Sequence, residues 1–442
     1  MSLSLARYLD RVRTCPMIRM EGEVKKVVGT VIEGEGPPIP VGGVCRILSP
    51  NLSEPVVAEA VGFRDGRVIL MPLSNCEGVQ PGSRIIAHRY EAKVGAGVGL
   101  LGRVLDGLGN PLDGEPAPSV EKFMSLYAPP LNPLRRSRIR EPLDVGVRSI
   151  NCLITLAKGQ RCGIMAGSGV GKSVLLGMMA RYTQADVNVI ALIGERGREV
   201  KEFIERDLGE EGLKRSVVVA ATSDTSPLIR IRGAYLATAI AEFFRDHQGK
   251  DVLLMMDSVT RFAMAAREVG LAAGEPPTTK AYPPSTFAHL PRLLERAGTN
   301  GGTGSITGIY TVLVEGDDMN EPIGDAVRSI VDGHIVLDRQ LATRGHYPAI
   351  DVLSSVSRLM GDVVDREHLS RAVELRRILA DYAKIEDLVN LGAYEKGANR
   401  RTDRALEMIE EVNAFLQQDV GRGCTLEEGL RELTRLLNSK KM

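Results

Sequence analysis

Residues Ala166–Val174 have the composition of a loop that binds phosphate groups, and they read AGSGVGKSV. Glycines let consecutive backbone N–H groups turn towards phosphate oxygens, a lysine can reach the β- and γ-phosphates, and a serine hydroxyl can bind Mg²⁺. A helical pattern follows the loop, so the positive end of a helix would face the same phosphates. Ala166 stands where such loops have their first glycine, which a negative φ allows. The residues expected to bind ATP are Gly167, Ser168, Gly169, Val170, Gly171, Lys172, Ser173 and Val174.

Two carboxylates follow apolar runs that are typical of buried strands. Asp257 ends the run Val252–Asp257, about 85 residues after the loop, and there it could hold Mg²⁺ through the water shell of the ion while Ser173 binds it directly. Glu195 follows another apolar run and offers a carboxylate that could orient or deprotonate water. A solvated charged loop is the alternative interpretation of Gly194–Glu199, and spacing alone favours that alternative slightly.

The composition limits the class of protein. A chain of 442 residues with 43% hydrophobic and 25% charged residues is expected to be globular, with two or three domains. The 56 basic and 56 acidic residues balance, which argues against a nucleic-acid partner held by overall charge but leaves a local basic patch open. The six cysteines are scattered, which favours reduced structural thiols. With no apolar run near the roughly 18 residues that span a bilayer and no signal-peptide pattern, we expect a cytoplasmic protein, peripheral to a membrane at most.

The N-terminal part of the chain shows two patterns. In residues 1–20, Leu5, Leu9 and Val12 share one helical face, which predicts a short amphipathic segment. That segment either packs on its own protein or contacts a partner or a membrane surface. Residues 21–91 carry short β-branched runs between turn residues, which indicates a small β-barrel or sandwich. The runs are Glu23–Ile32, Gly43–Leu48, Val56–Phe63, Arg67–Pro72 and Arg84–His88.

The rest of the chain divides into an α/β part and a helical part. Residues 92–361 alternate strand-like and helix-like segments, as in an α/β domain with a mainly parallel sheet. Within them, residues 92–141, with the Gly-rich stretch Gly95–Gly114, are interpreted as the connection into this domain. The apolar runs are Arg161–Met165, Val187–Ile193, Val217–Ala221, Val252–Met256, Ile306–Val314 and His334–Leu337, and the helical stretches are Ser173–Tyr182, Gly233–Arg245 and Val259–Leu271. Residues 362–442 predict a helical C-terminal domain from the helical spacing of Leu369, Val373, Ile378 and Leu379 and of Leu406, Ile409, Val412 and Phe415.

These motifs together resemble the catalytic subunit of the rotary ATP synthases and its relatives, and most closely the type III protein export ATPases. The resemblance covers nearly the whole chain from about Gly22, and two segments look more flagellar than injectisome-like, Gly212–Val219 and Arg232–Tyr235. The segments that carry the resemblance are Gly167–Arg181, Gly194–Val200, Asp257–Arg261, Gly274–Pro277, Glu315–Asp318 and His346–Asp351. It implies a multidomain fold with an N-terminal small β-barrel, a central α/β RecA-like P-loop ATPase core with a mainly parallel sheet, and a C-terminal α-helical domain.

The resemblance also implies roles for the chemical groups. Glu195 matches the catalytic carboxylate, and Lys172 matches the catalytic phosphate-binding position. Ser173 and Asp257 match the Mg²⁺ positions, with Asp257 acting through water. Arg358 matches an arginine finger that reaches the γ-phosphate of a neighbouring subunit, although from sequence alone a surface ion pair would be the better interpretation.

Three further residues are implied around the nucleotide. Tyr347 matches the position whose ring stacks on adenine, and its alternative is a core or interface tyrosine. Arg196 and Glu199 would surround the catalytic carboxylate as supporting groups.

The implied function is ATP hydrolysis by a homohexameric ring in the flagellar export apparatus, at the cytoplasmic face of the inner membrane. Export substrates, chaperones and the export gate would contact the C-terminal domain, and a stator-like regulator would contact the N-terminal segment. A virulence export ATPase is the alternative within this family. A rotary synthase subunit and a RecA-like hexameric RNA helicase are more distant alternatives. A non-catalytic nucleotide-binding subunit would be expected to lack Glu195.

Overall fold

The computed structural model describes residues 20–89, 92–314, 321–397 and 399–439, in two compact units. The first unit comprises Met1–Lys93 and Glu268–Pro276, and the second comprises Val94–Arg267 and Pro277–Met442. The amphipathic segment predicted from Leu5, Leu9 and Val12 lies outside the described residues.

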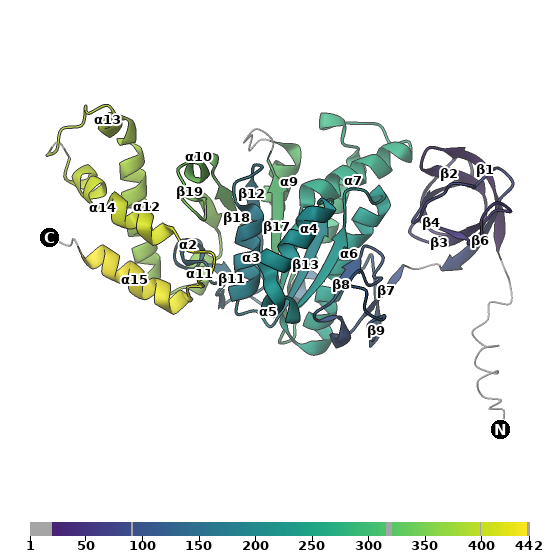
Figure 1. The fold of residues 1–442 in the computed structure, drawn as a ribbon, viewed down its shortest axis with the longest axis horizontal. Helices are drawn as coiled ribbons and strands as arrows, with labels where there is room; N and C mark the ends of the chain where they lie inside the picture. Colours follow the sequence, from purple (N-terminus) through teal and green to yellow (C-terminus); the bar gives the residue numbers. More distant parts are fainter. Residues whose placement is uncertain (1–19, 90–91, 315–320, 398, 440–442) are drawn as a thin grey trace, which may run out of the picture. The chain divides into compact units, whose positions relative to one another are not determined.

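Six strands of the first unit close into a barrel, which appears as a purple ring in Figure 1. Their order is β1-β2-β5-β4-β3-β6, and alternate residues such as Ile32, Ile47 and Leu70 fill the interior. The predicted run Glu23–Ile32 is wrong as one strand, because the chain turns at Gly29, where φ is 57°. The strands are β1 (Glu21–Val28), β2 (Val31–Glu35), β3 (Val44–Leu48), β4 (Val56–Arg64), β5 (Arg67–Pro72) and β6 (Arg84–Arg89).

A nine-stranded sheet forms the centre of the second unit, in the order β19-β18-β12-β17-β15-β13-β14-β8 with β16 beside β17. From β18 to β8 along this order the strands run parallel, whereas β19 and β16 are antiparallel to their neighbours. Every residue of β13 is buried, as expected for a parallel strand covered on both faces. The strands are β8 (Val104–Asp106), β12 (Arg161–Ala166), β13 (Val187–Ile193), β14 (Ser216–Ala221), β15 (Asp251–Asp257), β16 (Gly298–Thr299), β17 (Ser305–Leu313), β18 (Gly333–Leu337) and β19 (Ile350–Ser357).

The stretch Gly95–Gly114 is part of this fold, which corrects its interpretation as a plain connection. Its strand β8 pairs with β14 at the edge of the sheet. Three residues are too few to give a readable apolar pattern, so the sequence shows only the turns around them. Two small two-stranded sheets lie nearby in sequence, β7 (Lys93–Ala96) with β9 (Lys122–Ser125) and β10 (Pro142–Leu143) with β11 (Leu156–Ala157).

Helices cover the sheet, and the longest, α6, packs on β13, β14 and β15. Gly233 lets α6 approach the sheet, because a Cβ at that position would lie 3.1 Å from the Cβ of Ala221. The helices up to β19 are α2 (Arg148–Leu153), α3 (Lys172–Tyr182), α4 (Gly197–Glu202), α5 (Gly209–Lys214), α6 (Pro227–Gln248), α7 (Val259–Ala272), α8 (Pro284–Leu294), α9 (Pro322–Ile330) and α10 (Arg339–Thr343). One π-helical turn, η3 (Phe203–Leu208), and three 3₁₀ turns, η1 (Val98–Leu100), η2 (Pro133–Arg135) and η4 (Thr279–Ala281), complete the set.

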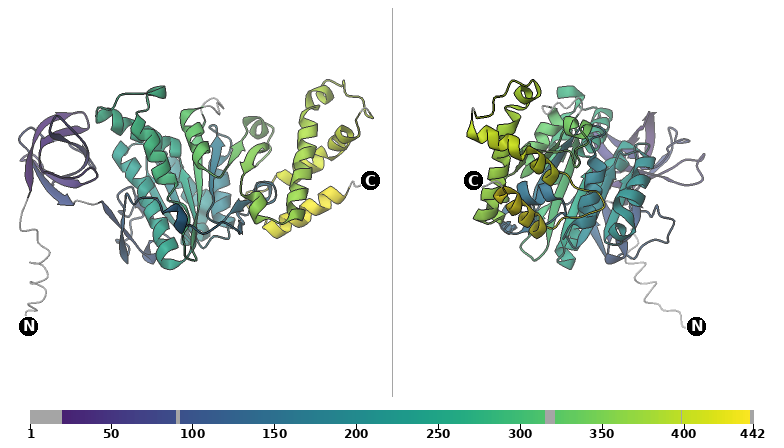
Figure 2. Two further views of the ribbon diagram at one scale, coloured as in Figure 1. Left: turned by 180° about the vertical axis from the view of Figure 1, so that it is seen from behind. Right: turned by 60° about the vertical axis from the view of Figure 1, so that its left-hand side comes forward.

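The C-terminal helices gather in one bundle, coloured yellow-green to yellow in Figure 2. Three of them, α12, α14 and α15, pack around α2, and Leu375, Met408 and Leu433 belong to the same hydrophobic core as the sheet. Of the residues expected on the apolar face of α12, Ile378 is buried and Leu369 and Leu379 pack against the core, whereas Val373 is 48% exposed. The helices are α11 (Met360–Val363), α12 (Arg366–Ala383), α13 (Glu386–Asn390), α14 (Arg400–Leu416) and α15 (Leu426–Asn438).

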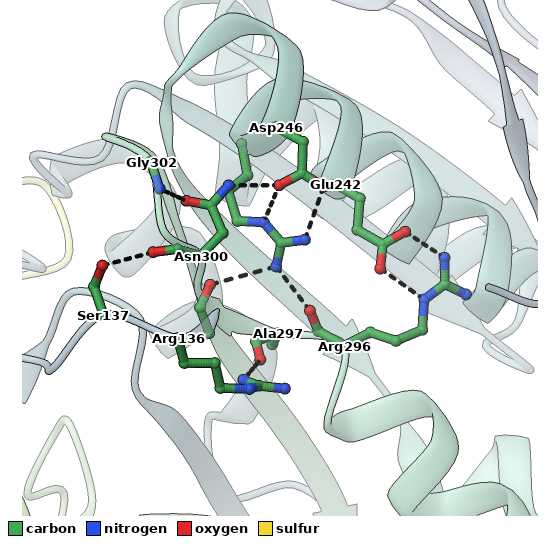
Figure 3. A network of polar contacts seen from close by, with 10 residues as sticks. Arg136, Ser137, Glu242, Asp246, Arg296, Ala297, Asn300 and Gly302 are labelled. Carbon is green, nitrogen blue, oxygen red and sulfur yellow. Dashed lines mark hydrogen bonds and ion pairs between the residues drawn. The ribbon is translucent and has the colours of Figure 1, made fainter. Parts of the chain in front are cut away.

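A buried ionic network, drawn in Figure 3, joins the end of α6 to the chain that leads into β16. Arg296 is fully buried and forms an ion pair with Glu242 through two hydrogen bonds, of 2.9 and 2.5 Å. Arg245 pairs with Asp246 and donates to the carbonyl oxygen of Arg296. Because each buried charge has a partner, losing one partner would be strongly destabilising, by about 3–5 kcal/mol.

No helix among the described residues is long and apolar enough to cross a membrane.

Candidate active site

The phosphate-binding loop joins β12, near the centre of the sheet, to the N-terminus of α3. Gly169 and Gly171 have φ values of 78° and 90°, a left-handed conformation that suits glycine. Ala166 is the last residue of β12, where an extended backbone accommodates its Cβ. Val170 is 2% exposed and anchors the loop in the core rather than facing outwards.

A cavity of about 790 Å³ opens beside this loop. Its lining includes most of the predicted nucleotide-binding residues: Gly167, Ser168, Gly169, Gly171, Lys172, Ser173 and Val174. It also includes six cationic side chains against three carboxylates, which suits a polyanionic ligand. The cations are Lys172, Arg196, Arg261, Arg267, Lys280 and Arg339, and the carboxylates are Glu195, Glu199 and Glu321.

Parallel strand ends bring Lys172, Glu195 and Asp257 together. The carboxyl-terminal ends of strands β12, β13 and β15 lie on the same side of the sheet as the loop. The Lys172 ammonium donates to Asp257 Oδ1 and lies 3.7 Å from Glu195 Oε1. Thr311, on the intervening strand β17, donates its hydroxyl to the same Asp257 oxygen at 2.8 Å. The predicted phosphate, base and metal-binding groups therefore meet at one point.

Glu195 has the electrostatic environment of a general base. Burial raises its pKa to about 7, with further upward contributions from the Asp257 charge and a hydrogen bond with Glu199, and Lys172 acts in the opposite direction. Its Oε1 is buried and accepts no hydrogen bond from the described residues. A carboxylate whose pKa lies near neutrality is matched to proton transfer at physiological pH.

The structure places Glu199 beside Glu195, at the first turn of α4. Arg196 donates to Glu199 Oε1 at 3.3 Å, and its own side chain is 73% exposed. The two residues lie where supporting groups were predicted, and their roles stay predictions.

Tyr347 lies against the phosphate-binding loop but outside the cavity lining. A Cβ on Gly171 would lie 3.4 Å from Cε1 of the Tyr347 ring, and the tyrosine is 43% exposed. An exposed ring next to the loop is in a suitable position to stack on a base.

Arg358 lies away from this cavity, at the amino-terminal ends of the parallel strands. It follows β19, whose last residue Ser357 pairs with Gly333 at the beginning of β18. The loop lies at the carboxyl-terminal ends of the strands, level with Leu337, the last residue of β18. Along β18, the distance from the level of Arg358 at Gly333 to the level of the loop at Leu337 is roughly 13 Å, at about 3.3 Å per residue.

Several residues of the site are absent from the sequence prediction. Arg339 donates to the carbonyl oxygen of Ser168 at 3.3 Å and lines the cavity. It follows β18 by two residues, so the strand end is the signal that could have indicated it. Thr311 lies inside a buried strand and gives no such signal. Arg261, Arg267 and Lys280 also line the cavity.

The oxygen atoms near the loop are suitable ligands for a Mg²⁺ ion. Ser173 lines the cavity at the start of α3, and Asp257 is 3% exposed with Lys172 and Thr311 on one of its oxygens. Hydroxyl and carboxylate oxygens are ligands that Mg²⁺ prefers, with water completing the shell. The orphaned Oε1 of Glu195 adds a buried acceptor nearby.

Comparison with protein families gives three matches along the chain. The beta-barrel domain of the ATP synthase alpha/beta family matches residues 24–88, and the nucleotide-binding domain of that family matches residues 146–357. The C-terminal domain of the T3SS EscN ATPase matches residues 364–435. These ranges correspond to the barrel, to the nine-stranded sheet without its edge strand β8, and to the C-terminal helices.

Individual relatives match over nearly their full length. A flagellum-specific ATP synthase of Bacillus subtilis is 52% identical over 434 residues, covering 98% of this chain and 99% of that protein. A type 3 secretion system ATPase of Xanthomonas euvesicatoria is 50% identical, with 97% of each chain covered. The assembled ATPase EscN of enteropathogenic E. coli, solved with its central stalk EscO, is 45% identical with a TM-score of 0.87, covering 94% of this chain and all of that chain.

Proposed function

This chain belongs to the type III export ATPases, a branch of the ATP synthase alpha/beta family, and we propose that it powers or promotes flagellar protein export by hydrolysing Mg·ATP at the Lys172–Glu195–Asp257 site. It is a P-loop ATPase that converts ATP and water to ADP and phosphate. The observation that carries the proposal is a cavity lined by cations in which the lysine of the loop, a buried carboxylate of raised pKa and a second carboxylate meet at the carboxyl-terminal ends of the strands.

In the proposed reaction, the backbone N–H groups of Gly167–Gly171 hold the phosphate oxygens at the N-terminus of α3. Lys172 leaves Asp257 for the β- and γ-phosphates, since phosphate oxygens compete for the same ammonium. Arg339 keeps the loop in shape through the carbonyl oxygen of Ser168.

Glu195 takes a proton from the water that attacks the γ-phosphate. Its pKa of about 7 lets it accept this proton and release it to solvent within one cycle. Glu199, which is hydrogen-bonded to Glu195, holds that side chain in place, and Arg196 in turn donates to Glu199.

Ser173 and Asp257 would hold the Mg²⁺ ion, Ser173 directly and Asp257 through water. When bound, the ion neutralises charge on the β- and γ-phosphates. Thr311 fixes the Asp257 carboxylate in position through its 2.8 Å hydrogen bond.

A ring of subunits completes the site. Arg358 lies at the opposite edge of the sheet from its own loop, so it serves the γ-phosphate held by the next subunit. A charge supplied in this way is worth about 10³–10⁵ in rate. The relative EscN is solved in assembled form with a central stalk, which supports a homohexamer for this chain as well.

The proposed partners follow from the same family. The C-terminal helices receive export substrates and chaperones and face the export gate, and the N-terminal segment binds a stator-like regulator. The ring acts in the cytoplasm, peripheral to the inner membrane. Nucleic acid is not among the proposed partners.

Virulence export is the second candidate, because a type 3 secretion system ATPase matches at 50% identity. A complementation experiment in a cell that lacks its own copy of this protein distinguishes the two candidate functions. Under the flagellar proposal, expression of the wild-type chain restores secretion of flagellar subunits and swimming, and the Glu195→Gln variant does not. Restored secretion of virulence proteins without swimming would instead establish the second candidate.

A further inference from the structure

The residue that carries the proposed finger, Arg358, is tied to Asp332, and Asp332 is held by Arg161. The backbone N–H of Arg358 donates to the carbonyl oxygen of Asp332 at 3.0 Å. The Asp332 carboxylate accepts from Arg161 three times: from its backbone N–H at 3.0 Å, from Nε at 3.2 Å and from Nη2 at 3.1 Å. Their side chains are only 16% and 25% exposed, for Arg161 and Asp332 respectively. One aspartate thus connects the first residue of β12 to Arg358.

The ion pair is itself braced from the other side. Arg161 also pairs through Nη1 with the carboxylate of Glu295. Arg136 donates to the backbone carbonyl oxygens of Glu295 and Ala297, and it lies beside the buried network of Figure 3. The position of Asp332 is therefore fixed by the core of the nucleotide-binding unit rather than by a loose surface turn.

The Arg358 side chain receives a second contact from the same region. Its Nη2 lies 3.5 Å from the carbonyl oxygen of Arg328, in the last turn of α9. The carbonyl groups at a helix C-terminus carry partial negative charge, which favours a guanidinium there. Residues 328–332 therefore hold Arg358 at both its backbone and its side chain.

We propose that Asp332, held by Arg161, is a positioning residue that sets the direction in which Arg358 reaches the neighbouring subunit. The inference rests on the proposed role of Arg358 as a finger acting in trans. A charged group misplaced by about 1 Å can lose about 10²-fold in rate. Asp332 touches no nucleotide in this account and acts only through Arg358.

The test begins with Asp332→Asn, which removes the charge and keeps the size of the side chain. We expect turnover of the assembled ring to fall about 10- to 100-fold, while the affinity for a fluorescent ATP analogue and the concentration at which subunits assemble stay unchanged. The matched control is Asp113→Asn. Asp113 accepts from Nε and Nη2 of Arg103 at 2.7 and 2.8 Å, and the two side chains are about as buried as those of Asp332 and Arg161. This pair lies next to β8, the edge strand at the far side of the sheet from β19. That control should retain turnover. Wild-type turnover of Asp332→Asn would overturn the inference.

Mixed rings separate positioning from a general structural defect. An Asp332→Asn subunit keeps an intact Glu195, and a Glu195→Gln neighbour keeps an intact Arg358. We expect the mixture to hydrolyse ATP several-fold faster than either variant alone, as should the reference mixture of Arg358→Ala with Glu195→Gln.

The two mixtures give distinguishable failures. If the reference mixture recovers activity and the Asp332→Asn mixture does not, Asp332 acts inside its own subunit and the inference is wrong. If neither mixture recovers activity, the finger does not act in trans, and the inference falls together with that part of the proposed function.

Discussion

Lys172 lies at the carboxyl-terminal ends of the parallel strands of the nine-stranded sheet, and Arg358 lies at their amino-terminal ends. Lys172 follows the end of β12, whereas Arg358 follows β19, which returns antiparallel to the beginning of β18. One chain therefore presents a phosphate-binding loop at one edge and a cation at the other. The loop of one chain and Arg358 of a second chain together would complete a single site.

The pH dependence of activity should report Glu195. Its pKa is raised to about 7 by burial and by Asp257, and the ionised form is the one that accepts a proton. We therefore expect kcat/KM, which reports the free enzyme, to rise between pH 6 and 8 and then level off. Melting temperatures at each pH would exclude unfolding as the cause. A flat profile across this range would contradict the assignment of Glu195 as the base.

The stability of the nucleotide-free protein should depend on the same group. The folded-state pKa of Glu195 lies above its ordinary value of 4.5, so the folded state binds the proton more tightly than the unfolded state. Its contribution to stability is present below about pH 4.5 and is lost as pH rises through about 7. Glu195→Gln should thus raise Tm more at pH 8 than at pH 5.5, by a few degrees, since 1 kcal/mol corresponds to roughly 2–4 °C.

The control for this comparison is Glu202→Gln, which removes the same charge from an exposed pair with Arg198. It should show no comparable gain at pH 8. An equal change in Tm at both pH values for Glu195→Gln would show that its carboxylate is ionised throughout.

Thr311→Val should weaken the use of Mg²⁺. The substitution keeps the shape of the side chain and removes the hydroxyl that donates to Asp257 at 2.8 Å. We expect the Mg²⁺ concentration for half-maximal turnover to rise several-fold. Thr238→Val is the matched control, because Thr238 is equally buried and bonds only the helix carbonyl oxygen of Ala234. Identical Mg²⁺ titrations for both variants would rule out the role given to Thr311.

Tyr347 should contribute to the binding of adenine through its ring alone. Stacking of a base on an aromatic side chain is worth about 1–3 kcal/mol. Tyr347→Ala should therefore raise KM for ATP about 10-fold or more with a smaller effect on kcat, and Tyr347→Phe should resemble wild type. If the phenylalanine variant lost as much affinity as the alanine variant, the hydroxyl rather than the ring would be the important group.

The sequence predicted the parts of the site that have a local pattern. The loop Gly167–Ser173 and the strands ending before Glu195 and at Asp257 are contiguous, so composition and hydrophobic runs indicate them directly. Thr311 and Arg339 reach the site only because distant strands end at the same edge of the sheet. No spacing rule connects them to the loop.

Short and amphipathic elements were predicted less well. The strand β8 has three residues and no pattern of its own, so its place at the edge of the sheet depends on tertiary pairing. The helical spacing correctly predicted that Leu369, Ile378 and Leu379 of α12 pack against the core. It wrongly included Val373, which is exposed, and it missed Ala372 and Leu375, which are buried. The domain boundary after residue 361 stays a prediction, since the C-terminal helices share one core with the sheet.

The measurement that tests the central claim most directly is steady-state Mg·ATP hydrolysis across a series of protein concentrations, for wild type, Glu195→Gln and Arg358→Ala. We predict that the specific activity of wild type rises cooperatively as subunits assemble, and that both variants bind ATP but lose about 10³-fold or more in turnover. If wild-type turnover per subunit is constant down to monomeric protein, or if Glu195→Gln hydrolyses ATP like wild type, the account is contradicted.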